Sequence, residues 1–270
     1  MDLDLLIPKG HRSPIREFLE TLASTSQVSA TATIEKGLYK HLRFGGLSGR
    51  LTIQDGMLDL DRVVAQSGTG HAAGRMVVRL PKGEPAETET SVRMTGIPAE
   101  ALLQLLGAHD QPVTGDMKLT GAMRGHGRNP HGVLPTLNGK VELVLQDGRI
   151  LKTEKRAIWK ILSILNLPAV LQGKVDLEKE GLQYNRASAT LTVQNGLVKT
   201  QNIILDSAVL KISAVGTYDM PTDQLDMIWA VSPFGSYSQF LKSIPLFGRL
   251  VAGDRKGLAT ALFQVKGSID

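Results

Sequence analysis

The sequence predicts a mainly β protein whose strands pair antiparallel, and two observations support this prediction. A short motif that ends in a hairpin dipeptide recurs three times, and apolar residues alternate with polar ones along many segments of the chain. The composition agrees, because 28 glycines and 12 prolines suit a chain with many turns. A length of 270 residues is enough for one large β domain or two ordinary ones.

The repeated motif is Leu-x-apolar-Gln-Asp/Asn-Gly-x-apolar, and it occupies residues 51–58, 143–150 and 191–198. In each copy two apolar residues alternate before the turn, as expected for a half-buried strand. Asp-Gly and Asn-Gly tolerate the positive φ angles of a type I′ turn, whose twist matches that of two paired strands. The sequence therefore predicts three hairpins, with turns at Asp55-Gly56, Asp147-Gly148 and Asn195-Gly196.

Further strands are predicted where the alternation continues between glycine or proline signals. Together with the three hairpins, they make antiparallel sheet the main structure of the chain. The additional predicted strands cover residues 116–123, 203–205, 209–218 and 225–231.

Four short amphipathic helices are predicted to interrupt the sheet. In the first, Ser13 can cap the helix and Pro14 fits its first turn. Gly107 is the expected C-cap of the second. Pro245 is expected to divide the fourth helix in two, because a proline in a helix interior removes a backbone hydrogen bond. The predicted helices lie near residues 13–22, 98–106, 155–165 and 237–251.

A domain boundary is predicted in residues 125–135, where Gly, His, Asn and Pro gather. Residues 81–85, which are bounded by two prolines, are expected to form a surface turn. The boundary gives an N-terminal β-rich repeat segment, residues 1–125, with the first two helices. The C-terminal β segment, residues 126–270, then has the other two.

Cysteine and charge content exclude several classes of protein. The absence of cysteine excludes disulfides, thiolate catalysis and Cys-bound zinc. A net charge of +5 permits attraction to phosphate, but the cations are interspersed with acids and few aromatics accompany them, so we expect no nucleic-acid partner. The N-terminus lacks the basic region of a signal peptide, and Asn166 and Pro168 interrupt the longest apolar stretch. The chain is therefore expected to be cytosolic or a piece of a longer protein.

Candidate chemical sites are few, and each has a simpler interpretation. The glycines of residues 68–74 resemble a dinucleotide loop only faintly, because no βαβ context surrounds them, and turn glycines explain them better. His126 and His131 are close in sequence, but no third metal ligand stands near them. Asp59 and Asp61 alternate with leucines, as on the polar side of a strand. We therefore predict a protein that is not an enzyme and that uses no cofactor or metal.

Residues 233–251 are unusually apolar and aromatic. They hold three of the six phenylalanines, with basic residues around them, as in a helix at a membrane interface. A helix buried against the end of the sheet explains the pattern equally well. The predicted membrane-contact or end-cap positions are Phe234, Tyr237, Phe240, Leu241, Ile244, Leu246, Phe247 and Leu250, and the headgroup-binding candidates are Lys242, Arg249, Arg255 and Lys256.

The C-terminal half also contains a distinctive series of segments: Gly216-Thr217-Tyr218-Asp219-Met220, Leu225-Asp226-Met227, Ser232-Pro233, Ile244-Pro245-Leu246-Phe247-Gly248 and Phe263-Gln264-Val265-Lys266-Gly267. In order and spacing they resemble the C-terminal region of AsmA-like proteins, bacterial envelope proteins implicated in moving lipids. The resemblance is specific over residues 115–270 and is strongest to YhdP-like members, to which TamB is related.

This resemblance implies a long curved antiparallel sheet, shaped like a groove or taco, along which acyl chains slide while headgroups stay in water. It also implies a periplasmic location in a Gram-negative envelope, with an inner-membrane anchor helix that is absent from this chain. Ordinary core packing explains each apolar strand position as well as a lipid groove does. The candidate groove residues are Leu51, Ile53, Leu143, Leu145, Leu191, Val193, Leu225 and Met227.

Three functions are open at this point. The first is non-enzymatic transport of lipid, with phospholipid as the expected cargo, between the inner and outer membranes. The second is a structural or assembly factor for the outer membrane that acts through contacts with envelope proteins. The third, an enzyme acting on envelope lipids or glycans, would need polar groups that converge in a pocket, and the sequence shows no such set.

Overall fold

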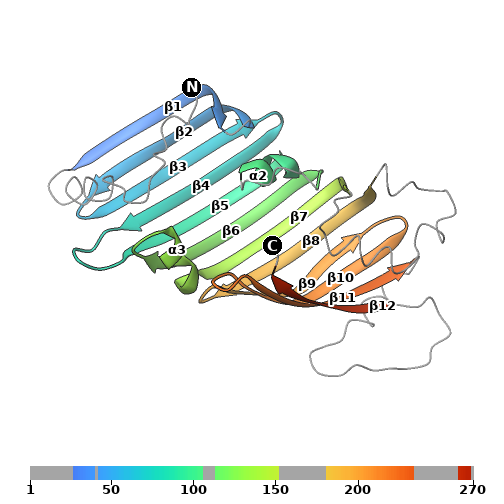
Figure 1. Ribbon diagram of the computed structural model, residues 1–270. Helices are drawn as coiled ribbons and strands as arrows, with labels where there is room; N and C mark the ends of the chain where they lie inside the picture. Colours follow the sequence, from blue (N-terminus) through green and yellow to red (C-terminus); the bar gives the residue numbers. More distant parts are fainter. Residues whose placement is uncertain (1–26, 40–41, 106–112, 152–180, 234–260, 269–270) are drawn as a thin grey trace.

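The computed structural model describes residues 27–39, 42–105, 113–151, 181–233 and 261–268. Within them, twelve strands form one antiparallel sheet in which each strand pairs with its neighbours in sequence, from β1 at one edge to β12 at the other (Figure 1). The predicted fold class is confirmed: the chain is mainly β, with a long, open, curved sheet and a few short helices. The strands are β1 (Val28–Tyr39), β2 (Leu42–Gln54), β3 (Met57–Ser67), β4 (Gly70–Arg79), β5 (Ala86–Pro98), β6 (Asp116–Gly127), β7 (Asn138–Ile150), β8 (Leu182–Gln194), β9 (Leu197–Asp206), β10 (Leu210–Asp219), β11 (Gln224–Pro233) and β12 (Ala261–Ser268).

Two of the three predicted hairpins are confirmed. Asp55 and Gly56 have φ angles of 50° and 72° and join β2 to β3, while Asn195 and Gly196 have φ angles of 50° and 77° and join β8 to β9. Both pairs have the left-handed backbone of a type I′ turn. The alternating apolar residues before each turn therefore do form half-buried strands.

The predicted hairpin at Asp147-Gly148 is wrong, because both residues lie inside β7. Asp147 has a φ of 50°, yet β7 continues beyond it and stays paired with β8, as Gly148 with Tyr184 and Ile150 with Leu182. The register of β7 against β8 is the same on both sides of Asp147, so the positive φ produces a local irregularity inside the strand instead of a reversal. Asp-Gly therefore forms a turn at residues 55–56 and lies within a strand at residues 147–148.

The prediction of a helix over residues 98–106 is confirmed by α2 (Ala99–Leu105), whereas the helices expected near residues 13–22, 155–165 and 237–251 lie outside the described residues. Two short helices occupy the predicted boundary region, α3 (Pro130–Val133) and η2 (Leu134–Thr136). The Asn129 side chain caps α3 by accepting a hydrogen bond of 2.7 Å from the Gly132 backbone. The strands on either side, β6 and β7, pair directly, and a division of the chain here remains a prediction.

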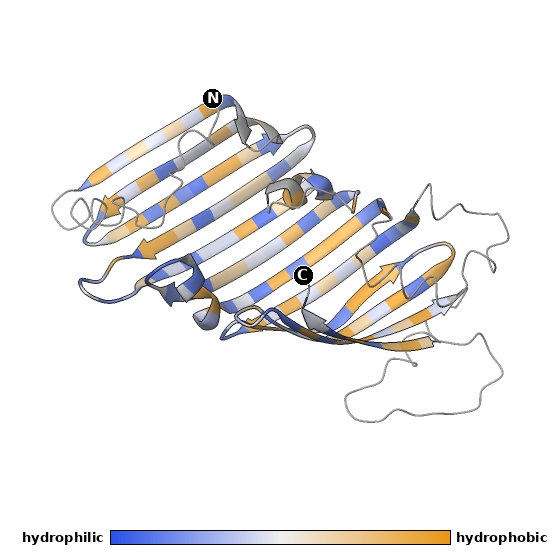
Figure 2. Ribbon diagram, viewed as in Figure 1, coloured by the Kyte–Doolittle hydropathy of each residue, from blue (hydrophilic) through white to orange (hydrophobic). Residues whose placement is uncertain are grey.

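The sheet has one apolar face and one polar face. Opposed residues in an antiparallel sheet project to the same side. One set of opposed residues runs across all twelve strands and defines the apolar face; it consists of Ala30, Leu51, Leu60, Met76, Thr90, Met123, Gly139, Val193, Val198, Tyr218, Leu225 and Gly267. Figure 2 shows the alternation of apolar and polar residues along the strands that produces these two faces.

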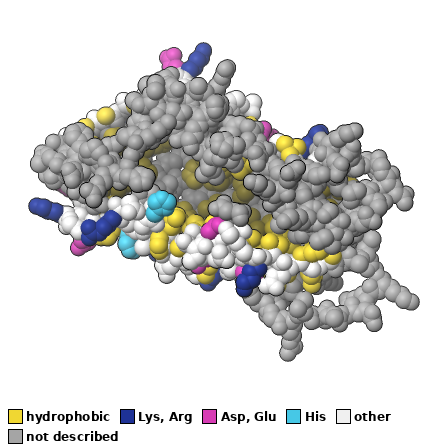
Figure 3. Space-filling model, viewed as in Figure 1, with side chains coloured by type: hydrophobic (Ala, Val, Ile, Leu, Met, Phe, Trp, Pro, Cys, Tyr) yellow, Lys and Arg dark blue, Asp and Glu magenta, His cyan; other side chains and the backbone are white. Residues whose placement is uncertain are grey.

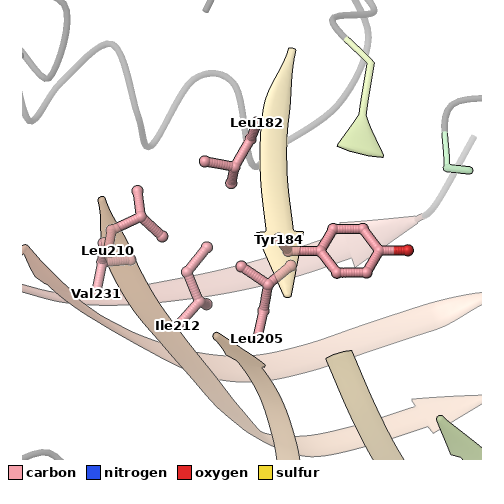
Figure 4. Packing of buried hydrophobic residues seen from close by; sticks show 6 residues of the cluster. All are labelled: Leu182, Tyr184, Leu205, Leu210, Ile212 and Val231. Carbon is pink, nitrogen blue, oxygen red and sulfur yellow. The ribbon is translucent and has the colours of Figure 1, made fainter. Parts of the chain in front are cut away.

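The buried core lies on the apolar face toward the end of the sheet that contains β12. We call it the C-terminal cluster, and Figure 4 shows it. Leu182 and Val231 have no exposed surface there, and Leu210 is 1% exposed. A second, smaller cluster joins α2 to the sheet through Ala101, which packs with Ile97 and Met117. The members of the C-terminal cluster are Leu182, Tyr184, Leu205, Leu210, Ile212 and Val231.

Candidate functional site

The apolar face is the candidate functional site, and it holds all eight predicted groove residues. The register places them on one side of β2, β7, β8 and β11; for example, Leu143 lies opposite Ala189, and Val193 lies opposite Gly139. Three of the eight, Ile53, Val193 and Met227, are buried, and the other five are partly buried. Their place on one surface agrees with a groove and also with ordinary packing, so a lipid-binding role for them is still a prediction.

Charged side chains are missing from this face over most of its length. From β3 to β12, no residue in the described strand pairing projects a Lys, Arg, Asp or Glu to the apolar side. Figure 3 shows hydrophobic side chains gathered across the hollowed middle of this surface. The arrangement provides a continuous apolar path perpendicular to the strands.

Methionines are a feature of the apolar face that the sequence analysis did not single out. Five of them project from it, on β4, β5, β6 and β11. Their unbranched, polarisable side chains adapt to irregular apolar partners, as at surfaces that bind many ligands. Met76 is 40% exposed and Met117 is 1% exposed, so the set includes both accessible and packed positions. The five are Met76, Met94, Met117, Met123 and Met227.

The opposite, polar face is lined by ion pairs. Arg75 donates two hydrogen bonds to the Asp59 carboxylate, one of them 2.9 Å long. This bonding holds the pKa of Asp59 below its usual value. A hydrogen bond of 3.0 Å from Gln264 likewise lowers the pKa of Asp226. These groups are charged at neutral pH and face water, so this side is an unsuitable surface for acyl chains.

At one edge of the apolar face, the Tyr184 hydroxyl fits into a space left by two glycines, which we call the notch. The Tyr184 hydroxyl donates a hydrogen bond of 2.5 Å to the Thr114 carbonyl. Gly115 and Gly148 leave room for it, since a Cβ on either residue would press on the phenol oxygen. Burial, together with the nearby Glu100 charge, raises the pKa of Tyr184 to about 12. The notch thereby ties β8 to the segment that leads into β6.

We expect Tyr184→Phe to lower the free energy of unfolding by about 1–2 kcal/mol at pH 7.5, because the Thr114 carbonyl loses its side-chain donor. The raised pKa adds a dependence on pH. The folded state holds the phenol proton more tightly, so this contribution is complete below pH 10 and is lost as pH rises toward 12. Urea unfolding at pH 7.5 and pH 10.5 tests both effects. If the free energy of unfolding of the variant fell between pH 7.5 and pH 10.5 as much as that of the wild type, the pH dependence could not be assigned to Tyr184.

The other residues considered from the sequence lie elsewhere. Asp59 and Asp61 project to the polar face, as expected for the polar side of a strand. His126 is near the end of β6 and His131 is in α3. In the described part of the chain, no three His, Cys, Asp or Glu residues gather as a metal site would require. The predicted membrane-contact and headgroup residues, Phe234 to Lys256, lie outside the described residues.

No helix in the described segments is both long and apolar enough to cross a membrane. No solved structure matches the chain. A curated relative, the AsmA family protein YhjG of Escherichia coli (strain K12), is 27% identical over 117 residues, which are 43% of this chain and 16% of that protein. The match therefore spans only a small part of its relative. The family profile described as YhdP protein matches residues 9–270, and the chain belongs to this AsmA-like, YhdP-type family.

Proposed function

We propose that this chain is a non-enzymatic lipid conduit of the bacterial envelope, which carries phospholipid between the inner and outer membranes as part of a longer, anchored periplasmic protein. The apolar face, which carries no charged side chain in the described strand pairing from β3 to β12, supports this proposal most directly. Each acyl CH₂ that such a face shelters from water recovers about 0.8 kcal/mol. A path of many similar apolar positions favours movement, because no single position binds much more tightly than the next.

The distribution of polar groups over the two faces also supports lipid binding without catalysis. A lipid that lies on the apolar face needs its headgroup in water, since an unpaired charge is costly to bury. An enzyme would instead need polar groups that converge around a reacting atom. On the apolar face of the described strands, the side chains with polar atoms are isolated ones such as Thr90, Thr200 and Tyr218. A passive hydrophobic surface fits this arrangement best.

Replacing Met76 with Asp tests the proposal, because Met76 is on the apolar face and is 40% exposed, so the substitution should leave the fold intact. We expect native mass spectrometry to find phospholipid on the purified wild type and at least tenfold less on the variant, since an acyl chain that covers position 76 would have to bury an unpaired carboxylate. Leu191→Asp should have the same effect at a second point of the path.

The matched control is Thr192→Asp, one residue from Leu191 and exposed on the polar face between Lys140 and Lys199. It should retain the lipid. Wild-type protein without lipid would argue against the conduit and favour a scaffold that acts through protein contacts. Equal lipid on wild type and Met76→Asp would show that lipid binds elsewhere.

A further inference from the structure

The polar face contains a hollow that the proposed conduit does not use. Its volume is about 400 Å³, and it opens on the side of the sheet opposite the apolar path. Strands β3, β4 and β5 supply most of its walls, and Gly46 of β2 completes them. The side chains that give it chemical character are Val64, Gln66, His71, Arg93 and Thr95.

The register sets basic groups around one hydroxyl in this hollow. Thr95 lies opposite His71 on β4 and opposite Lys118 on β6. Arg93 is two residues earlier on β5 and therefore projects to the same side. Opposed Cβ atoms lie about 5 Å apart, and next-but-one residues of a strand are about 7 Å apart. Three basic side chains thus surround the Thr95 hydroxyl at distances that a single small anion can span.

These basic side chains differ from the other cations near them. Arg75 pairs with Asp59, Arg79 with Glu89 at 3.3 Å, and Lys140 with Glu142. In contrast, His71, Arg93 and Lys118 form no ion pair with any described residue. All three are exposed. No acidic side chain in the described part of the chain therefore neutralises these three basic groups in and beside the hollow.

The acids nearest to this group stand outside it. Asp116 precedes Lys118 by two residues, and Glu142 lies on β7 across Thr120 from Arg93, diagonal to Lys118. Neither forms an ion pair with Lys118. The residues opposite and diagonal to Arg93 on β4 are Ala73, His71 and Arg75, which add no negative charge next to it.

We propose that this hollow binds a phosphate monoester group. Arg93 supplies a planar guanidinium that can bind two phosphate oxygens at once, and Lys118 adds a second charge. Thr95 donates its hydroxyl, and the His71 ring donates an N–H in either protonation state. The ester belongs either to a soluble phosphorylated molecule or to a lipid headgroup at a membrane surface. This site is independent of the apolar path, because the sheet separates them.

Two probes distinguish the sources. Glycerol 3-phosphate, titrated against ¹⁵N-labelled protein, reports soluble esters through amide shifts in β4 to β6. Flotation with phosphatidylcholine vesicles, with and without phosphatidic acid, reports the headgroup. Saturable binding to glycerol 3-phosphate identifies a site for soluble esters, and binding only to vesicles with phosphatidic acid identifies a headgroup site. Absence of both would overturn the proposal.

The double variant Arg93→Gln/Lys118→Gln should weaken the binding at least tenfold. Arg124→Gln/Lys199→Gln removes the same charge from exposed positions of the polar face outside the hollow and should change affinity less than twofold. Thr95→Val keeps the shape and charge of the hollow and should still weaken binding severalfold. If both double variants lost affinity equally, net charge alone would explain the binding, and a defined site would be refuted. Phospholipid on the apolar path should be unchanged in all of them, so this test is separate from that of the conduit.

Discussion

Gly148→Ala is expected to lower the free energy of unfolding by about 3 kcal/mol or more. A Cβ at this position would run into the Thr114 carbonyl oxygen and the Tyr184 phenol, both of which are already engaged with each other. A backbone carbonyl cannot move aside as a flexible side chain can, so β7 or the segment before β6 must shift. The hydrogen bond of Tyr184 should be lost in the same step. Urea unfolding followed by circular dichroism measures the change.

Gly121→Ala is the matched control for this prediction. Gly121 also lies on the apolar face, in β6, but a Cβ there would be in ordinary contact, 3.4 Å from the nearest atom of Val141. We expect no loss of stability and a gain of up to about 1 kcal/mol, because alanine loses less backbone entropy than glycine on folding. Equal losses in the two variants would show that the notch around Tyr184 has no special role.

Leu210→Ala is expected to lower the free energy of unfolding by about 2–5 kcal/mol. Leu210 is 1% exposed and belongs to the C-terminal cluster, where it packs with side chains from β8, β9, β10 and β11. Removing its side chain leaves a cavity that rigid strands can close only in part. The same urea titration at pH 7.5 measures the loss.

Leu262→Ala removes the same atoms from a site that is 41% exposed on the polar face of β12. Its cost should stay within about 1 kcal/mol, since less apolar surface is returned to water. A small effect at Leu210 would mean that the cluster does not stabilise this end of the sheet. In that case, the strands from β9 to β12 would depend on backbone pairing alone.

The sequence predicted the apolar face well where strands are regular. Within β2, β7, β8 and β11, alternate residues share a side, so pairs such as Leu191 and Val193 could be assigned to one surface from their spacing alone. The sequence could not show that the faces of separate strands coincide. That depends on register, which turns and bulges set over the whole sheet.

Irregularities inside strands explain most of what could not be predicted. From its spacing to Ala187, Tyr184 would be placed on the polar side, but the pairing of β7 with β8 is interrupted where Asp147 has its positive φ, and Tyr184 lies in the C-terminal cluster. Gly96, with a φ of 65°, lies at a shift in the register of β5 against β6, between Thr95 and Ile97. Positive φ at a single residue inside a strand has no clear signature in sequence, because the same residues make turns.

The hollow that we propose as a phosphate monoester site could not be recognised from the sequence for a related reason. Arg93, Lys118 and His71 are far apart in sequence and look like scattered surface cations. Only the register of β4, β5 and β6 brings them around Thr95. The three basic residues form no ion pair with a described acid, unlike Arg75, Arg79 and Lys140. This difference could have marked the site, but it can be recognised only when the pairing of the strands is known.

The strictly sequential pairing of the twelve strands gives the sheet a modular length. Each strand exchanges backbone hydrogen bonds only with the one before it and the one after it, so the energetics approximate a one-dimensional chain of nearest neighbours. Most of these contacts are local and can form in order along the polypeptide, whereas the β7–β8 and β11–β12 pairs must also close the longer connections between Ile150 and Leu182 and between Pro233 and Ala261. A hairpin inserted or removed would lengthen or shorten the sheet by two strands and leave the packing at a distance unchanged. The number of hairpins in such an architecture therefore sets the length of the sheet.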